Sequence, residues 1–592
     1  MKKILSLMFV LVSFGVSQDT LFVPWSSAVD HLNNVILSDR DSDGNQLHDV
    51  YLLETGSGEV GVYYMRHMIE ITGDLNITGG YSSDWERPAI IQPVANPDGS
   101  SGFTGWPQLN FRVIQNEAVL VLRNLIFNQV DRDQNFALDG VATAEGDRQK
   151  IIIDNSIVSG CKTLAFSSLG TSADFHFVNS IAKDWNTGPG TMFFGGLFWG
   201  GGSWMGTVDT LVVENSTVHD LFGNAIVIYE HVDHGLINQN TFANISMSVV
   251  WWRGQNNLTV KNNLFYNTKS YGQSNHDINH WGVWFSGGVG QMSIHPRYEE
   301  SYVMEDDGQY VDLENRNINY HNNVWFHDVQ LIDYMQRGPW SWESVEEDED
   351  GNETMVTLFD SMLPISDQSK WLDDSTIVAI EQNVGIMESN NINVDPEIAL
   401  DPSFISHQIS RSWDFRDNQE HDTYPFTEPL WRLSLGMNPV NIEWPLNLDL
   451  SYNLDTPAGS ASEEMGPVGD PRWHNRPGIF ANALAFAQDY VNSNSDEYGQ
   501  VPFNLISEFG LVVDGANISG GIGGSVVDSC DINWPTDPYK AAVYSFVSEY
   551  VLDQGASVGC FLENTTLDQS FAEVAITMEE LWTGHGDGGD EG

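Results

Sequence analysis

A short pattern recurs along the middle of this 592-residue chain and limits what the chain can fold into. In each copy, apolar residues alternate with others, an Asn follows, and another apolar pair comes after it. The copies are VLRNLIF (Asn124), IIIDNSIV (Asn155), FHFVNSIA (Asn179), LVVENSTV (Asn215), LINQNTF (Asn240), LTVKNNLF (Asn263) and INYHNNVWF (Asn323), with a weaker echo in VAIEQNVGI (Asn383). Their Asn residues lie 31, 24, 36, 25, 23, 60 and 60 residues apart. Units of this length must stack on one another to bury a core.

The repeat predicts an all-β solenoid, the parallel β-helix, in which the shorter intervals are single turns and the longer ones carry inserted loops. Asn tolerates the unusual backbone angles of a corner between strands. Asn residues at the same place in successive turns can also form a ladder of hydrogen-bonded amides. A propeller would need a period nearer 40 with four strands per blade. A sandwich would not repeat one Asn at one place.

The two ends of the chain differ from the repeat. Residues 1–17 have a basic start and an apolar run, which is typical of a bacterial-type signal peptide and predicts a secreted or cell-surface protein. Residues 26–37 have near-helical apolar spacing and predict a helix that caps the open end of the stack. We expect the solenoid, with its loop insertions, over residues 18–475. Residues 476–592 predict a small α+β domain with a frayed acidic tail, and the acidic run 342–355 predicts a solvated loop.

The formal net charge is −57, from 82 acidic and 25 basic residues. Such a chain repels nucleic acids and anionic membranes, so neither is an expected partner. No stretch after the signal peptide is long and apolar enough to insert in a membrane. The acidity itself has two explanations, solubility in a salty medium or calcium binding. Three cysteines exclude a disulfide scaffold, and Cys161 is expected to be a small buried hydrophobe.

The predicted N-terminal helix, the turn LNITGGYSSDW (75–85) and the Asn-marked turns resemble secreted right-handed parallel β-helix proteins of the pectate-lyase-like kind. The stretch SYNLDTPAGSASEEMGPVGDPRW (451–473) is similar to the last turn of many bacterial members. The resemblance covers roughly residues 20–475. It implies the fold, but this fold hosts lyases, hydrolases, epimerases, adhesins and inert stalks, so it does not by itself imply an activity.

A second strand is expected to recur after each Asn corner and to form one parallel sheet. The segments are KTLAFSS (162–168), TMFFGG (191–196), NAIVIYEH (224–231), SVVWWRGQ (248–255) and HWGVWFSGG (280–288). Aromatic residues on its outer face would form a platform for sugar rings. The expected substrate-binding residues, depending on register, are Phe194, Tyr229, Trp251, Trp252, Trp284 and His280. The alternative is that these rings belong to the core or lie under inserted loops.

The enzymes that this chain resembles mostly cleave acidic polysaccharides by β-elimination, with Arg or Lys as the base. Arg253 is the only Arg or Lys on the proposed face and is therefore the expected base. His231 or His234 could serve as an acid or a base instead. No lyase, hydrolase or epimerase motif carries over residue by residue, so the sequence leaves open whether the protein is an enzyme.

One loop has the composition of a calcium site. In DRDSDGNQLHD (39–49), the carboxylates of Asp39, Asp41, Asp43 and Asp49 surround a Gly turn and could supply oxygen ligands to a structural calcium ion. The alternative is a polar loop between the cap helix and the first strand.

Two functions follow from the sequence. The first is an exported β-helix protein that binds, and in one version cleaves, an extracellular polysaccharide along its aromatic-rich strand face. The alternative is a non-catalytic structural surface protein or adhesin. The sequence does not indicate an oligomeric state.

Overall fold

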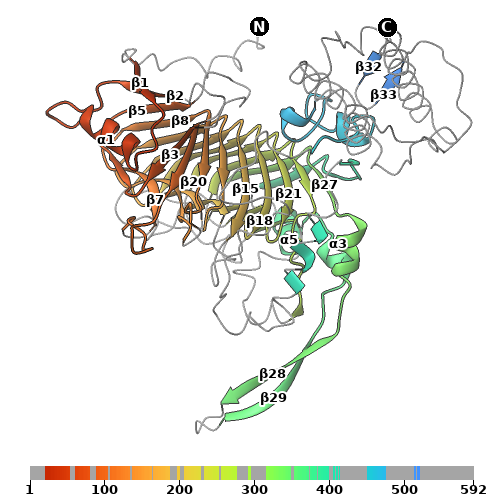
Figure 1. The fold of residues 1–592 in the computed structure, drawn as a ribbon. Coiled ribbons are helices and arrows are strands. Elements are labelled where there is room, and N and C mark those ends of the chain that lie inside the picture. The colour runs from red at the N-terminus through yellow and green to blue at the C-terminus, as the bar shows by residue number, and fades with distance from the viewer. Residues whose placement is uncertain are drawn as a thin grey trace, which may run out of the picture. The chain divides into compact units, whose positions relative to one another are not determined.

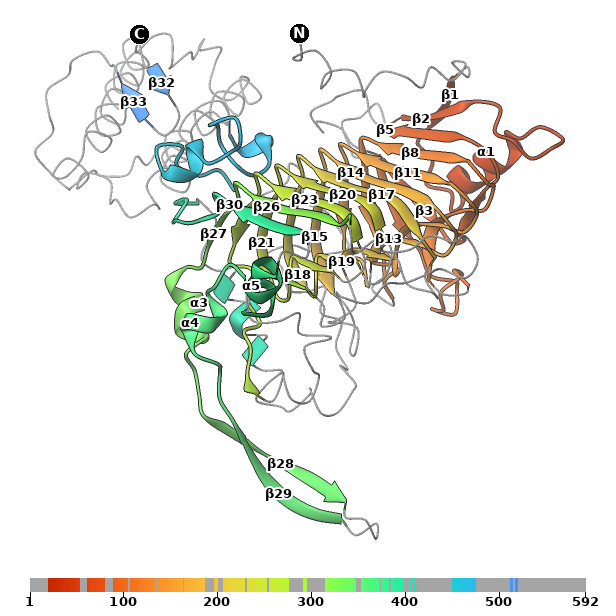
Figure 2. The same cartoon turned by 180° about the vertical axis from the view of Figure 1, so that it is seen from behind.

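The fold is described from a computed structural model of the chain (Figures 1 and 2). The structure describes residues 20–53, 61–79, 89–104, 107–133, 136–162, 164–186, 196–200, 206–228, 232–252, 255–275, 291–294, 315–347, 353–372, 374–382, 385–398, 405–406, 408–410, 412–413, 450–474, 512–514 and 517–519. By internal contacts the chain divides into one unit of Met1–Leu450 with Asp455–Pro471, and a second unit of Ser451–Leu454 with Arg472–Gly592. The domain boundary expected at residue 475 and the signal peptide stay predictions.

The first unit is a parallel β-helix of three long sheets, which confirms the predicted fold class. Sheet A pairs β1 (Thr20–Pro24), β2 (Asp49–Leu53), β5 (Leu75–Gly79), β8 (Val119–Arg123), β11 (Lys150–Asp154), β14 (Ala173–Val178), β17 (Val208–Glu214), β20 (Val232–Asn238), β23 (Gln255–Lys261), β26 (Asn317–His321) and β30 (Ile386–Ser389). Sheet B pairs β3 (Gly61–Met65), β6 (Ala89–Pro93), β9 (Leu125–Asn128), β12 (Ile157–Ser159), β15 (Ile181–Asn186), β18 (Thr217–Phe222), β21 (Thr241–Ile245), β24 (Leu264–Tyr266), β27 (Val324–Phe326) and β31 (Ile392–Asn393). Sheet C pairs β4 (Ile69–Ile71), β7 (Leu109–Val113), β10 (Gly140–Ala144), β13 (Leu164–Ser168), β16 (Gly196–Gly200), β19 (Ile226–Ile228), β22 (Val250–Trp252) and β25 (Met292–Ile294). From β2 to β25 the chain visits the sheets in the order A, B, C in each turn.

Alternation along the sheet A strands decides which side chains enter the core. In β11, Ile151 and Ile153 are fully buried, and their neighbours Lys150, Ile152 and Asp154 point outward and are partly exposed. Parallel, in-register pairing places the equivalent residues of the next turn above them, so Ile151 pairs with Phe175. The stacked inner residues form one continuous core along the solenoid.

The corner between sheets A and B carries the repeating Asn, but in two adjacent rows. Asn124, Asn155, Asn179 and Asn215 occupy the left-handed region, with φ between 45° and 55°, and later turns place Gln239, Asn262, Asn322 and Asn390 there. Asn240, Asn263 and Asn323 lie one position later. The single-row alignment of the sequence was therefore shifted by one residue after Asn215. Asn383 lies outside the described residues, and Asn390 and Asn391 continue the two rows.

The second of these rows forms the predicted amide ladder. The side chain of Asn240 donates to Oδ1 of Asn263 at 3.0 Å, Asn263 donates to Asn323 at 2.9 Å, and Asn323 donates to Asn391 at 2.8 Å. Toward the N-terminus the ladder changes to serine, where the backbone N–H of Ser216 donates to Asn240 Oδ1 at 3.0 Å. The ladder is buried, so each bond satisfies a group that would otherwise lack a partner.

The predicted N-terminal helix is present as α1 (His31–Ser38) and is shorter than expected. It begins after Asp30, whose carboxylate accepts a hydrogen bond from the backbone N–H of Arg66 at 2.6 Å. Leu32 and Ile36 are fully buried and belong to the solenoid core, so α1 covers the first turns.

The described parts of the acidic run 342–355 are strands and not the predicted loop. They belong to an antiparallel hairpin of β28 (Trp340–Glu347) and β29 (Glu353–Asp360), which extends away from the solenoid (Figure 1). Beside its base are α3 (Val329–Tyr334) and α4 (Ile365–Gln368), and α5 (Asp374–Glu381) follows. Among the described residues, no helix has both the length and the apolar character that a membrane span requires.

The end of the chain is described only in part. Short 3-10 helices η3 (Pro457–Ser460) and η4 (Pro471–Trp473) precede one small hairpin of β32 (Val512–Asp514) and β33 (Asn517–Ser519). Most of the residues of the predicted α+β domain lie outside the described part of the chain. Cys161 is fully buried, as expected, and burial raises the pKa of its thiol.

Candidate functional site

The second series of predicted strands forms sheet C, with shifted limits. The segments near residues 162–168, 224–231 and 248–255 contain β13, β19 and β22. Of the segment 191–196 only Gly196 is described, and β16 begins there. The segment 280–288 lies outside the described residues, and β25 follows β22 in the sheet. The prediction of one stacked sheet is therefore confirmed for the three segments that contain β13, β19 and β22, and for 280–288 it stays a prediction.

The register of sheet C separates the two adjacent tryptophans. Trp252 pairs with Ile228, points into the core and is fully buried. Its indole N–H donates to the hydroxyl of Tyr320, and the guanidinium of Arg316 lies 5.7 Å from its ring centre. The prediction that Trp252 binds substrate is therefore wrong, because its side chain faces the core. Trp251 has the opposite parity on the strand, although its side chain is outside the described part.

The outer face of sheet C is exposed at its first strands and covered further along. The register joins Glu70, Arg112, Thr143 and Ser167 in one row, which continues through Trp199, Val227 and Trp251. Glu70 is exposed and Arg112 is partly exposed. Thr143, Ser167 and Val227 have no exposed surface. An open aromatic platform is thus not seen among the described members of this row. The predicted residues Phe194, Tyr229, His231, Arg253, His280 and Trp284 lie outside the described residues, and their roles stay predictions.

His234 is described, and it lies on another sheet from Trp251. It belongs to β20 on the outer face of sheet A, pairs with Thr210 on one side and Asn257 on the other, and is exposed. The outer face of sheet A carries three parallel rows of side chains from consecutive turns. The polar row is Lys150, Asp174, Thr210, His234 and Asn257, and the apolar row is Val121, Ile152, His176, Val212 and Leu236. The ionic row is Arg123, Asp154, Val178, Glu214, Asn238 and Lys261, in which Val178 is the one apolar member.

The polar row mixes charged and neutral groups that are partly exposed. Burial raises the pKa of Asp174, while a hydrogen bond from Thr210 and the positive charge of Lys150 oppose that rise. Asn257 donates through Nδ2 to the backbone carbonyl of Asp233 at 3.2 Å. Strands in a sheet are spaced about 4.8 Å apart, so the five side chains extend over roughly 19 Å along the solenoid.

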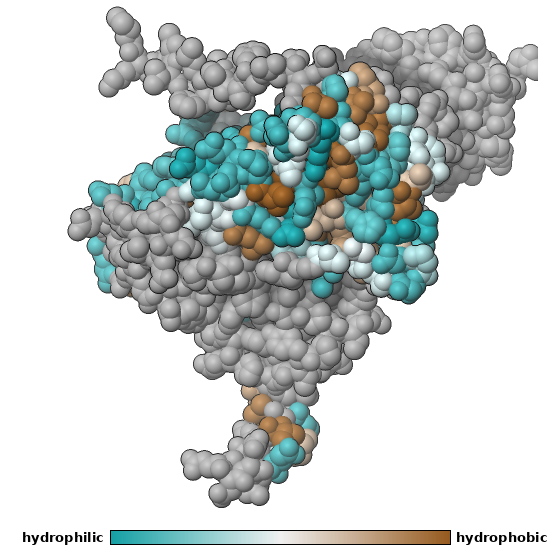
Figure 3. Space-filling view, turned by 90° about the vertical axis from the view of Figure 1, so that its left-hand side faces the viewer, coloured by the Kyte–Doolittle hydropathy of each residue, from teal (hydrophilic) through white to brown (hydrophobic). Residues whose placement is uncertain are grey.

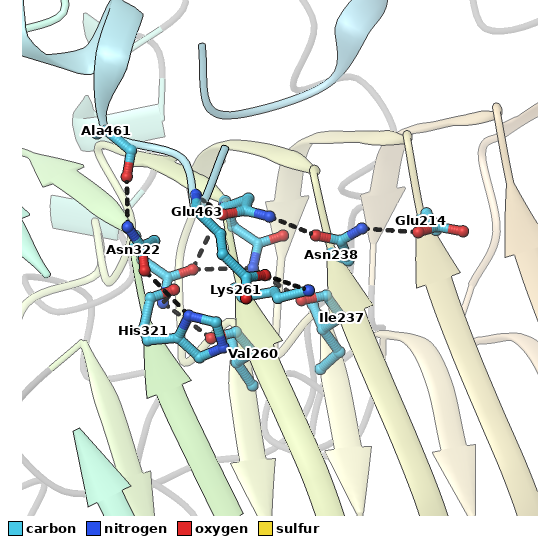
Figure 4. A network of polar contacts seen from close by, with 12 residues as sticks. Glu214, Ile237, Asn238, Val260, Lys261, His321, Asn322, Ala461 and Glu463 are labelled. Carbon is cyan, nitrogen blue, oxygen red and sulfur yellow. Dashed lines mark hydrogen bonds and ion pairs between the residues drawn. The ribbon is translucent and has the colours of Figure 1, made fainter. Parts of the chain in front are cut away.

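Polar contacts hold the ionic row in two parts, one on each side of Val178, and Figure 4 shows the part with Glu214, Asn238 and Lys261. Arg123 pairs with Asp154 at 2.9 Å, and Asn238 donates to Glu214 Oε1 at 2.7 Å. Lys261 pairs at 2.7 Å with Glu463, which comes from the segment 455–471 near the C-terminal end of the unit. This row is therefore held in place, and at Lys261 it is partly covered by the later segment.

The apolar row lies between these two hydrophilic rows. Val121 is 8% exposed, and Ile152, Val212 and Leu236 are partly exposed although they point away from the core. His176 is the one ionisable member; burial and the charge of Lys150 lower its pKa to about 4, so its ring is neutral at pH 7. A neutral imidazole keeps this row largely uncharged. The side of the molecule in Figure 3 likewise shows hydrophobic residues in small groups among hydrophilic ones.

A buried ionisable cluster lies on sheet B, and the sequence reasoning missed it. Lys183 pairs with Asp184 at 2.5 Å, and Nδ1 of His219 contacts Oδ2 of Asp220 at 2.7 Å. Asn244 donates to the other oxygen of Asp220 at 2.9 Å. Lys183 and His219 are register partners in consecutive turns, and each is followed by an Asp. This repeated pair of a basic residue and Asp is the sequence signal that could have revealed the cluster.

The geometry of the cluster suits proton transfer, since an aspartate orients the imidazole and its Nε2 has no hydrogen-bond partner among the described residues. However, all four ionisable side chains are 6% exposed or less, so a substrate has no direct access to them. In this structure the cluster is a buried polar network rather than an open catalytic site.

The predicted calcium loop is ordered by its own hydrogen bonds. Asp41 accepts bonds from the backbone N–H groups of Asp43 and Asn45, and Asp39 contacts the ring of His48 at 2.7 Å. Asp49 accepts a bond from Asn76 at 2.9 Å. No three acidic, histidine or cysteine residues in the described part of the chain are arranged to hold a metal ion. Calcium binding stays a prediction.

Comparison with known proteins adds no further assignment. No family model matches the sequence, and no curated protein matches it. The assignment to the parallel β-helix architecture rests on the strand pairing of the three sheets.

Proposed function

We propose that this protein is exported and binds an extracellular polysaccharide along the outer face of sheet A. One observation carries the proposal, the partly exposed apolar row between the polar and ionic rows. A sugar ring has an apolar C–H face and a hydroxylated rim, and this surface offers matching strips to both. The rows repeat with every turn, as the units of a linear glycan do.

Two features define the expected ligand. The net charge of −57 disfavours a polyanionic glycan, so we propose a neutral, hydroxyl-rich polysaccharide as the preferred class. The hydrophilic rows supply both donors and acceptors for hydroxyl groups, among them Thr210, His234 and Asn257. This proposal moves the binding face from the aromatic strands to the neighbouring sheet, because Thr143, Ser167 and Val227, the described outer residues among the later strands of sheet C, are fully buried.

Affinity electrophoresis through gels that contain neutral or acidic polysaccharides tests the proposal. We expect the wild-type chain to be retarded by at least one neutral glycan, and the variant Val212→Glu/Leu236→Glu to bind at least tenfold more weakly. Val329→Glu is the matched control, because Val329 is 70% exposed on α3 and belongs to none of the rows. Equal retardation of the wild type and the double variant, with unchanged thermal stability, would refute binding at this face.

Cleavage of the glycan is a separate prediction from the resemblance to pectate-lyase-like proteins. Incubation with alginate and pectin in the presence of calcium, followed by the absorbance of unsaturated uronates, tests it directly. Loss of product in Arg253→Ala would support the proposed base. A lack of product from every glycan would leave the binding and structural roles as the alternatives, and the electrophoresis decides between those two.

A further inference from the structure

The hairpin of β28 and β29, called the arm here, extends away from the solenoid in both ribbon views (Figures 1 and 2). Its two strands pair over eight positions, from Trp340 opposite Asp360 to Glu347 opposite Glu353. They form a sheet of only two strands, so each strand has one edge that is not paired within the sheet. An unpaired edge is a template for another strand.

The base of the arm is packed against the body. The ring of Trp340 meets that of Trp413 edge-on at 5.7 Å, and both lie against a small core of Leu331, Tyr334, Met335, Met362, Ile405 and Ile409. Just beyond β29, the backbone N–H of Leu363 donates to the carbonyl of Gln273 at 2.8 Å. The base is thus anchored, and the arm presents its outer part to solvent at a defined place.

One face of the arm carries exposed apolar side chains. Val345 is 54% exposed, and its cross-strand partner Met355 is 62% exposed. Phe359 lies four residues after Met355, on the same face of β29, and is 74% exposed. Thr357 lies between the last two and donates to Glu343 across the strands at 2.8 Å. Three large apolar side chains in a row on one face are more than scattered surface hydrophobicity.

The charge of the arm limits what can cover this face. Residues 340–360 contain eight acidic residues and no Lys, Arg or His. A second copy of the chain would bring like charges together, and an anionic surface would be repelled. A basic partner is attracted, and acidic groups beside an apolar face are the complement of a strand in which basic and apolar residues alternate.

We propose that the arm is a docking element for a protein partner, which adds a basic extended segment with alternating apolar residues to an edge of the hairpin. Backbone hydrogen bonds to the free edge would supply affinity, and contacts with Val345, Met355 and Phe359 would supply specificity. The proposal is independent of polysaccharide binding, because the arm and sheet A share no residues.

Fluorescence anisotropy with the full-length protein and three labelled peptides tests the proposal. The peptides alternate Lys with Val, Lys with Ser, and Glu with Val. We expect the Lys–Val peptide to bind best and the Glu–Val peptide not to bind. Binding of the Lys–Val peptide should fall at least tenfold in Met355→Ser/Phe359→Ser and remain in Val329→Ser, a control at another exposed apolar residue.

Two results would overturn the proposal. If the Lys–Val and Lys–Ser peptides bind equally, or if the double variant binds as the wild type does, the attraction is to the acidic surface in general. If light scattering finds a dimer that Met355→Ser/Phe359→Ser dissociates, the arm is instead a contact between copies of this chain.

Discussion

Single residues matter most in this molecule where a buried polar group repeats from turn to turn. The ladder of Asn240, Asn263 and Asn323 places several hydrogen bonds on each amide in a region without solvent. Removing the amide of Asn263 takes these hydrogen bonds from the backbone N–H of Asn240 and the carbonyl of Ile237 in the preceding turn. In a stack of turns, a local defect of this kind also weakens the interface with both neighbours.

We therefore expect Asn263→Ala to lower the free energy of unfolding by about 2–4 kcal/mol, because its Nδ2 and Oδ1 bond to Ile237, Asn323 and Asn240. Asn317→Ala is the control, since Asn317 is exposed on the outer face and should cost less than about 0.5 kcal/mol. Urea unfolding followed by circular dichroism measures both. Equal losses in the two variants would show that the ladder does not contribute.

A second residue-scale prediction concerns His176, whose pKa is about 4 in the folded chain instead of the ordinary 6.5. Below pH 6.5 the unfolded chain takes up a proton that the folded chain does not, so the folded state loses stability as the pH falls from about 6.5 to 4. Above pH 6.5 the contribution is fully present. The loss from this group is at most about 1.4 kcal/mol per pH unit.

The stability of His176→Leu should therefore fall less than that of the wild type as the pH drops over that range. Val212→Leu, in the same row, removes no ionisable group, so its stability should fall with pH as steeply as that of the wild type. Thermal unfolding between pH 4 and 7.5 measures the difference. Parallel curves for His176→Leu and the wild type would contradict the burial of a neutral ring.

Elements far apart in sequence are joined by the segment 455–471. Its Asp470 accepts a hydrogen bond from Thr217 at 2.7 Å and donates its backbone N–H to Thr241 at 2.9 Å. Gly469, at φ 84°, lets the segment 455–471 come close to Thr241, because a Cβ at this position would lie only 2.7 Å from the Oγ1 of Thr241. These contacts bind two turns of the solenoid to a segment more than 200 residues later.

At this scale we expect Asp470→Ala to destabilise the unit by about 1–3 kcal/mol, because Asp470 is 1% exposed and the hydroxyl of Thr217 would lose its partner. Glu463→Gln removes only a half-exposed ion pair with Lys261 and should cost less than about 1 kcal/mol. Urea unfolding compares them, and hydrogen exchange of β18 and β21 should rise only in Asp470→Ala. A larger loss in Glu463→Gln would reverse this ranking.

At the scale of the whole molecule, the net charge affects the stability of the folded state. With a net charge of −57, self-repulsion opposes the compact state, and added salt screens it. We expect the urea midpoint at pH 7.5 to rise between 0.05 and 0.5 M NaCl, and the rise to shrink at pH 5, where part of the carboxylates are protonated. A midpoint that falls with salt would mean that specific ion pairs outweigh the repulsion.

The sequence by itself determined the architecture, because the architecture follows from local patterns that repeat along the chain. Alternation such as that of Ile151 and Ile153 selects the inner face of a strand, and a residue that accepts a positive φ, such as Asn155, marks the corner. Both signals act over a few residues and recur in every turn. That is why the solenoid, the cap helix and the stacking of the second strand series could be predicted.

Only the tertiary structure decided which strand face each remaining side chain occupies. A shift of one residue turns a strand over, so the neighbours Trp251 and Trp252 could not be assigned before the register was known. Likewise His234 belongs to sheet A and not to the aromatic strands, and the cluster of Lys183 and His219 depends on pairing between turns. These contacts join residues tens to hundreds of positions apart, and burial and charge pairing at such distances arise only when the turns stack.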